Sequence, residues 1–250
     1  MRPDNLRFLL PSGRSLSDST LRHLKAGGIT VARSHERCYS ADMWHERGHY
    51  DFSVESLPRQ VFFAKPDQVV RMVYSGEYDA GITGFDMLHE IIGPKGSENH
   101  DWSTFEKIEI CGSYQYGRNG GKQEIALFTK HGSGAADFQR RPTNSDRVAS
   151  EYPNITRRLF EWWGRNPIVE PSVGCVETRV LSGDYLYGVT LVESGETLRA
   201  NNFYYHSKLM DTYPVLIANK SALEEKCWLK DVLDNLDRTL KKSLNSKESN

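Results

Sequence analysis

The chain has 250 residues and a formal net charge of −1 at pH 7, from 32 basic and 33 acidic side chains. This length can bury a substantial core in one large domain or two lobes. The balanced charge argues against a broad nucleic-acid or membrane-binding surface. No apolar run is long enough for a membrane span or signal peptide, and four cysteines without a CxxC pair are typical of reduced thiols. We therefore expect a soluble cytoplasmic protein.

In the first half of the chain, short apolar strands alternate with helical segments. Strands are predicted at residues 6–10, 29–32, 61–64 and 79–84, with helices at 17–26 and 67–74. In the second half, strands are predicted at 107–111, 124–128, 147–149, 189–192 and 214–218, and residues 167–170 lead into another strand. A helix is predicted at 154–163, and an amphipathic helix with a lysine-rich end at 223–244.

Alternation of this kind predicts an α/β fold with largely parallel sheets. In such folds ligands bind at the carboxyl ends of strands. Four segments of small and polar residues fall at these ends: Ser12–Arg14, Thr83–Gly84, Tyr152–Thr156 and Ser194–Thr197.

The clearest of these segments follows the apolar run Val189–Val192, which stops at Ser194-Gly195-Glu196-Thr197-Leu198. Backbone N–H groups at a strand-to-helix turn point outward, and the helix N-terminus adds positive potential, so an anion can bind there. The alternative is an ordinary turn with a threonine N-cap. The segment alone leaves both interpretations open.

Four segments in order resemble the catalytic core of the ATP phosphoribosyltransferase family, the first enzymes of histidine biosynthesis. They are residues 6–28, 78–88, 147–164 and 174–202, and YPVLIANKSAL near residue 214 also matches. Insertions fall near 38–58 and 92–123. The resemblance implies two α/β lobes like those of a type II periplasmic binding protein, with the site in the cleft. Lobe I would hold residues 1–107 and 206–225, lobe II 108–205, and residues 226–250 a C-terminal helix and tail.

The implied reaction transfers the phosphoribosyl group of phosphoribosyl pyrophosphate (PRPP) to N1 of ATP and releases pyrophosphate. Such a displacement needs no covalent nucleophile, but two polyanions must be held in line and the departing pyrophosphate stabilised. Mg²⁺ carried with PRPP would be the cofactor. Two alternatives remain: a transferase acting on another nitrogen heterocycle, and a non-catalytic nucleotide-binding or regulatory protein that kept the cleft.

The resemblance also implies partners. The chain ends about 25 residues after the matching segment YPVLIANKSAL, which leaves no room for a C-terminal regulatory domain. We therefore expect the short form of the family, a homodimer that can join a histidyl-tRNA-synthetase-like regulatory subunit. No nucleic acid or membrane partner is expected.

Site residues carry over by matching position. The 5′-phosphate of PRPP would lie on the loop made of Glu193, Ser194, Gly195, Glu196, Thr197 and Leu198. Arg14 would face the pyrophosphate and Glu177 the ribose, as the catalytic candidates. The remaining cleft and nucleotide candidates are Ser12, Gly13, Thr83, Gly84, Asp86, Tyr152, Arg157, Arg158 and Thr190. Asp86 could instead cap a helix, and at most one of the adjacent Arg157 and Arg158 is expected to face the cleft. No resident metal site is predicted.

The chain departs from the family pattern near the loop and near Arg14. The family usually has an aspartate where Thr190 stands, and often a lysine where Pro11 and Ser12 stand. Tyr185 and Gly188 replace small and branched residues. Altered PRPP geometry, a different acceptor and loss of catalysis are competing explanations. We favour a divergent active transferase, because the phosphate loop itself is preserved.

A rival motif, His45-Glu46-Arg47-Gly48-His49, matches the HExxH zinc pattern. That pattern needs an amphipathic helix, whereas these flanks are those of an expected hairpin insertion. Glu55 is near, but no third ligand follows at the metzincin spacing. We interpret the match as chance.

Overall fold

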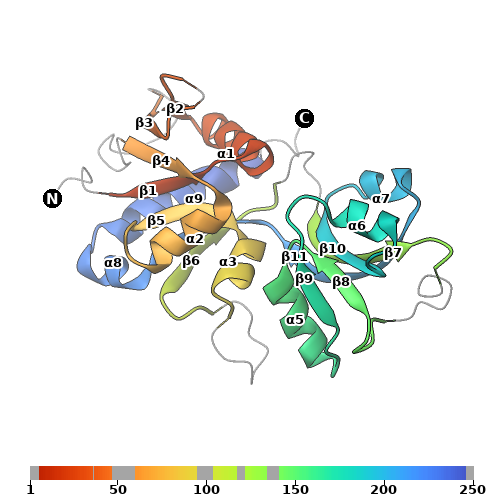
Figure 1. Cartoon of the computed structure of the whole chain (residues 1–250). Helices are drawn as coiled ribbons and strands as arrows, with labels where there is room; N and C mark the ends of the chain where they lie inside the picture. Colours follow the sequence, from red (N-terminus) through yellow and green to blue (C-terminus); the bar gives the residue numbers. More distant parts are fainter. Residues whose placement is uncertain are drawn as a thin grey trace. The chain divides into compact units, whose positions relative to one another are not determined.

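A computed structural model describes residues 6–35, 37–46, 60–94, 104–116, 122–133 and 141–245, with only the backbone of Arg14, Ser15 and Asn245. The chain forms two compact units (Figure 1). Unit 1 comprises Met1–Gly120 and Tyr213–Asn250, and unit 2 comprises Gly121–Thr212. Among the described helices, none has the length and apolar character needed to cross a membrane.

Unit 1 is built on a seven-stranded sheet with the order β2-β3-β4-β1-β5-β12-β6. Its central strand β1 runs parallel to β4 and β5, and the other pairs are antiparallel. The strands are β1 (Phe8–Pro11), β2 (Ile29–Ala32), β3 (Ser40–His45), β4 (Gln60–Ala64), β5 (Ala80–Gly84), β6 (Ile108–Ser113) and β12 (Pro214–Asn219).

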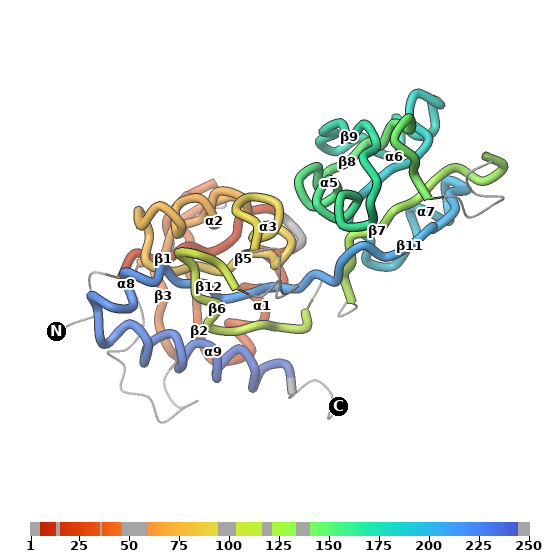
Figure 2. Tube along the Cα trace, turned by 90° about the horizontal axis from the view of Figure 1, so that it is seen from below, coloured from red at the N-terminus to blue at the C-terminus, as the bar shows by residue number. Residues whose placement is uncertain are grey.

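Helices cover both faces of this sheet. On one face α1 (Arg14–Ala26) and α9 (Leu229–Asn245) bury Leu24 and Leu236 against Phe8 and Leu10. On the other face lie α2 (Pro66–Tyr74) and α3 (Phe85–Ile91), opposite α9 (Figure 2). Because side chains alternate along a strand, Leu9 points away from Phe8 and Leu10 toward the α2 face. The wholly buried β1 therefore contributes to both cores.

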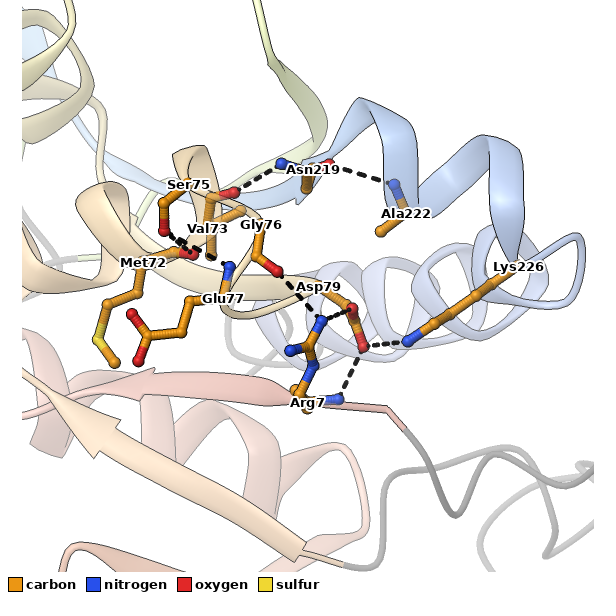
Figure 3. A network of polar contacts seen from close by, with 10 residues as sticks. All are labelled: Arg7, Met72, Val73, Ser75, Gly76, Glu77, Asp79, Asn219, Ala222 and Lys226. Atoms are coloured by element: carbon orange, nitrogen blue, oxygen red, sulfur yellow. Dashed lines mark hydrogen bonds and ion pairs between the residues drawn. The ribbon is translucent and has the colours of Figure 1, made fainter.

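Buried polar groups join the last segment of the chain to the first half of unit 1 (Figure 3). The Asp79 carboxylate, 1 % exposed, pairs with Arg7 at 3.0 Å and with Lys226 at 2.6 Å. Asn219 donates from Nδ2 to the Val73 carbonyl at 2.8 Å and accepts from the N–H of Ala222 in α8 (Lys220–Glu225). These contacts fix α8 against β5 and α2.

Unit 2 has a five-stranded sheet with the order β11-β7-β10-β8-β9. Its strands are β7 (Gln123–Lys130), β8 (Arg147–Ser150), β9 (Ile168–Pro171), β10 (Tyr187–Val192) and β11 (Phe203–Thr212). α6 (Val176–Ser182) and α7 (Glu196–Ala200) bury Val176, Val180 and Leu198 in one core with Phe128. α5 (Pro153–Trp162) packs on β8 and β9.

The expected α/β class is correct, but the expectation of largely parallel sheets is wrong. β8 runs parallel to β9 and β10, whereas β7 is antiparallel to both β10 and β11. Among the described strands of unit 1, only the pairs β1–β4 and β1–β5 are parallel. Hydrophobic pattern identifies a strand but carries no information on its direction.

The unit boundaries also differ from the expected lobe boundaries. β6 pairs with β12, so unit 1 extends past residue 107 to Gly120. β11 pairs with β7 as far as Thr212, so unit 2 extends past residue 205. α9 packs against α1, which places the C-terminal helix within unit 1.

Candidate functional site

In unit 1 the carboxyl ends of β1 and β5 bring two of the expected segments to one edge. Leu9 lies opposite Gly81 in this parallel pair, so Ser12 and Gly84 each follow three residues later at the same edge. The N–H of Ser12 donates to the Ala64 carbonyl at 2.7 Å. Gly13 is the N-cap of α1, whose first residue is Arg14. The side chain of Arg14 lies outside the described part of the structure.

Thr83 and Asp86 are both held within unit 1. The buried Thr83 hydroxyl donates to the Pro66 carbonyl at 2.9 Å, which ties β5 to the start of α2. Asp86 lies in the first turn of α3 and is 8 % exposed. Its carboxylate folds back over Gly84, where a Cβ would overlap it. The Thr83 hydroxyl thus has a structural hydrogen bond. The N-cap of α3 is Gly84, without a side-chain capping hydrogen bond, so Asp86 is not the cap of this helix.

Lys65 is a basic residue at the same edge that the sequence interpretation missed. It stands between β4 and α2, directly after Ala64, and its side chain is exposed. The sequence could have indicated Lys65, because it directly follows the predicted strand 61–64, just as Ser12 lies shortly after the first predicted strand. Because Ser12 bonds to the carbonyl of Ala64, the backbone of Lys65 adjoins the Ser12–Gly13 turn.

In unit 2 the expected phosphate loop is a turn between β10 and α7. Gly195 has a left-handed backbone (φ 68°) that favours glycine, and it is the N-cap of α7. Ser194 Oγ accepts from the Glu196 N–H at 3.3 Å, and Arg199 donates to the Ser194 carbonyl at 2.8 Å. Leu198 is buried, whereas Ser194, Glu196 and Thr197 are exposed. The turn is thus anchored by Leu198 and presents its hydroxyl groups to solvent.

A pocket of about 290 Å³ lies beside this loop. Among the residues that line it are Glu124, Glu193, Arg199 and Tyr205. The Tyr205 hydroxyl donates to Glu124 at 2.8 Å, and burial together with this carboxylate raises the pKa of Tyr205. Gln123 donates to Glu193. Two carboxylates against one guanidinium do not favour an anion inside this pocket.

Thr190 is buried on β10, and its hydroxyl donates to Glu151 Oε2 at 2.7 Å. Glu151 directly follows β8, and its N–H donates to the Val189 carbonyl at 3.0 Å, one step beyond the β8–β10 ladder. The sequence interpretation missed Glu151. A carboxylate from a neighbouring strand end therefore lies in contact with Thr190.

The remaining candidates in unit 2 differ in exposure. Tyr152 is the buried N-cap of α5, and its carbonyl accepts from the Thr156 N–H at 2.9 Å. Arg157 donates to the Val169 carbonyl at 2.9 Å, a contact within the unit, while Arg158 is half-buried. Glu177 is half-buried in the first turn of α6, which begins over Gly188.

Two further departures from the family pattern, at Tyr185 and Gly188, have local structural explanations. The Tyr185 hydroxyl donates to Glu170 Oε2 at 2.6 Å and accepts from Arg147 and Arg179. Hydrogen bonds from Tyr185 and Arg147 lower the pKa of Glu170. Gly188 leaves room for the ring of Phe128.

The HExxH segment lies partly outside the described residues, which end at Glu46 on this side. His45 ends strand β3, so its backbone is not that of the helix on which zinc enzymes carry this motif. Thr30 donates to the Glu46 carboxylate. No group of three or more His, Cys, Asp or Glu side chains suited to a metal occurs among the described residues.

Comparisons with known proteins point to one family. The ATP phosphoribosyltransferase family model (HisG) matches residues 65–242. ATP phosphoribosyltransferase of Caldicellulosiruptor bescii is 28 % identical, over 94 % of this chain and 99 % of the relative. That of Pyrococcus furiosus is 28 % identical, over 91 % and 93 %. The fold matches a solved ATP phosphoribosyl transferase (HisG:HisZ) complex from Thermotoga maritima, with TM-score 0.68, 21 % identity and coverage of 96 % and 99 %.

Proposed function

The chain belongs to the ATP phosphoribosyltransferase family, the enzymes of the first step of histidine biosynthesis, and on that premise we propose its reaction. It transfers the phosphoribosyl group of PRPP to N1 of ATP and releases pyrophosphate. The observation that carries the proposal is the turn Ser194–Thr197, which is exposed at the end of β10 and anchored by the buried Leu198. Its hydroxyl and N–H groups suit a phosphate.

Each unit has a distinct part in this proposal. The Ser194–Thr197 turn of unit 2 binds the 5′-phosphate, and Glu177 serves the ribose. In unit 1 the Ser12–Gly13 turn, with Arg14 and Lys65, stabilises the negative charge that develops on the departing pyrophosphate. PRPP enters as its Mg²⁺ complex. Because Mg²⁺ is commonly held by substrate phosphates and a few waters, the chain needs no cage of protein ligands for it.

The wider proposal rests on the family resemblance. It includes a two-lobed fold of the type II periplasmic-binding-protein kind, with the substrates held in the cleft, and action in the cytoplasm. It also includes a homodimer that joins a histidyl-tRNA-synthetase-like regulatory subunit.

The test is pyrophosphate release from PRPP and Mg²⁺ with ATP, measured with and without a regulatory subunit. Release that depends on ATP supports the proposal. Release only with another nitrogen heterocycle would retain the reaction class and reject ATP as the acceptor. Binding of PRPP without release under any of these conditions would indicate a regulatory protein instead.

Thr197→Ala tests the phosphate loop. We expect the KM for PRPP to rise about fivefold, because a net hydrogen bond is worth about 1 kcal/mol, with the KM for ATP unchanged. Steady-state kinetics at saturating cosubstrate measures both. The matched control is Thr178→Ala, an exposed threonine on α6. Equal effects of the two substitutions on the KM for PRPP would contradict a phosphate contact at Thr197.

A further inference from the structure

We propose that Glu151 is a second carboxylate that binds the ribose diol of PRPP, in addition to Glu177, with Thr190 as its positioning residue. The inference rests on the proposed function and adds to it a residue that the sequence pattern did not indicate. Its starting point is the contact of 2.7 Å between the Thr190 hydroxyl and Glu151 Oε2, formed by residues 39 positions apart.

The backbone on both sides of Glu151 is fixed. Its N–H donates to the Val189 carbonyl at 3.0 Å, and the next N–H, that of Tyr152, donates to Ser150 Oγ at 2.9 Å. Ser150 Oγ in turn lies 2.8 Å from Thr156 Oγ1 in α5. The carboxylate therefore projects from a rigid strand end, as a binding group should.

The Glu151 carboxylate has unused bonding capacity. It is half-buried, and among the described residues its side chain contacts only the Thr190 hydroxyl, with no cation in ion-pair range. An ionised carboxylate can accept about four hydrogen bonds. Oε1 is thus free to accept from a ligand.

Position favours a sugar diol as that ligand. Thr190 and Ser194 lie on the same chain segment, four residues apart, with Thr190 on β10 and Ser194 in the phosphate turn. A ribose 5-phosphate whose phosphate binds this turn presents its hydroxyl groups several bonds away, toward the strand. Vicinal hydroxyls are paired donors that match a carboxylate. Thr190 holds Oε2, so Oε1 faces the diol.

Binding of ribose 5-phosphate and of 2-deoxyribose 5-phosphate, measured by calorimetry without Mg²⁺, tests this assignment. We expect the wild type to prefer ribose 5-phosphate by about tenfold, because one hydrogen bond to a charged group is lost with the 2-hydroxyl. Glu151→Gln keeps the side-chain shape and should bring the ratio close to one. The matched control is Glu161→Gln, which removes an exposed carboxylate on α5 and should leave the ratio unchanged.

Kinetics separate positioning from binding. Thr190→Val should raise the KM for PRPP severalfold, and Thr190→Ser should restore it, because serine keeps the donor. The KM for ATP should change in neither variant. Melting temperatures identify any variant that fails to fold. If Glu151→Gln does not fold, the comparison of Thr190→Val with Thr190→Ser tests the assignment instead.

The outcomes are distinct. An unchanged sugar preference in folded Glu151→Gln, or no preference in the wild type, would overturn the diol assignment and leave the transferase proposal intact. A defect of Glu151→Gln that appears only when Mg²⁺ is present would also overturn it, in favour of a metal contact. A wild type that binds neither sugar phosphate and releases no pyrophosphate would overturn both proposals.

Discussion

Asp79→Asn is expected to lower the free energy of unfolding by about 3 kcal/mol, because it removes the shared partner of a buried ion-pair network. Asp79 is 1 % exposed and accepts from the Arg7 backbone at 2.9 Å, from the Arg7 guanidinium at 3.0 Å and from Lys226 at 2.6 Å. Asparagine cannot accept from both cations, and its amide adds a buried donor. Urea denaturation at pH 7 measures the loss.

The effect should depend on pH. Burial alone would raise the pKa of Asp79, but the hydrogen bonds from Lys226 and Arg7 outweigh burial and lower it. A carboxyl whose pKa is lower in the folded state stabilises the fold above the pKa of the unfolded chain, about 3.9. That contribution is lost as the pH falls through the folded-state value. The difference between wild type and Asp79→Asn should therefore shrink as the pH falls from about 5 toward 3.

Asp42→Asn is the matched control, because Asp42 is exposed on β3 of the same sheet. Its effect should stay within about 0.5 kcal/mol. Equal losses for the two variants, or a constant difference across the acidic range, would contradict the role assigned to Asp79.

The sequence predicted strands well where they are fully buried and poorly where they are not. Residues 79–84 and 214–218 match β5 and β12 within one residue. β11 was missed, because its ten residues are mostly half-buried or exposed and carry no clear alternation. α3 and α6 were missed, because seven residues show too little helical periodicity.

The sequence could predict only those parts of the candidate site that directly follow a recognisable strand. The turn at Gly195 and the Ser12–Gly13 turn follow directly from apolar runs, and so does Lys65, which was overlooked. The partner of Thr190 could not be predicted in the same way. Glu151 reaches it only because Val189 pairs with Ser150, and no local pattern specifies the pairing of two strands 39 residues apart.

Gly188→Ala is expected to destabilise unit 2 by about 2–3 kcal/mol, although alanine is ordinarily favoured over glycine in a strand by about 0.5–1 kcal/mol. A Cβ at Gly188 would lie 2.7 Å from Val176 Cγ1 and closer still to the ring of Phe128. Phe128 is fully buried and packs edge-to-face on Phe203 at 4.8 Å, so the ring has no room to move. Close packing makes such an overlap costly.

A double-mutant cycle with Phe128→Leu separates this overlap from other effects. Leucine lacks the ring atoms nearest to the added methyl group, so Gly188→Ala should cost at least 1 kcal/mol less in the Phe128→Leu background than in the wild type. Chemical denaturation of the four proteins gives the coupling. Additive losses of unfolding free energy would show that the Phe128 ring is not what requires glycine at position 188. A positive coupling would show that Gly188, one of the departures from the family pattern, is a packing solution at the start of β10. Gly188 would then be explained by packing and not by PRPP binding. Of the departures on β10, only Thr190, with its partner Glu151, would remain as a candidate for an effect on PRPP affinity.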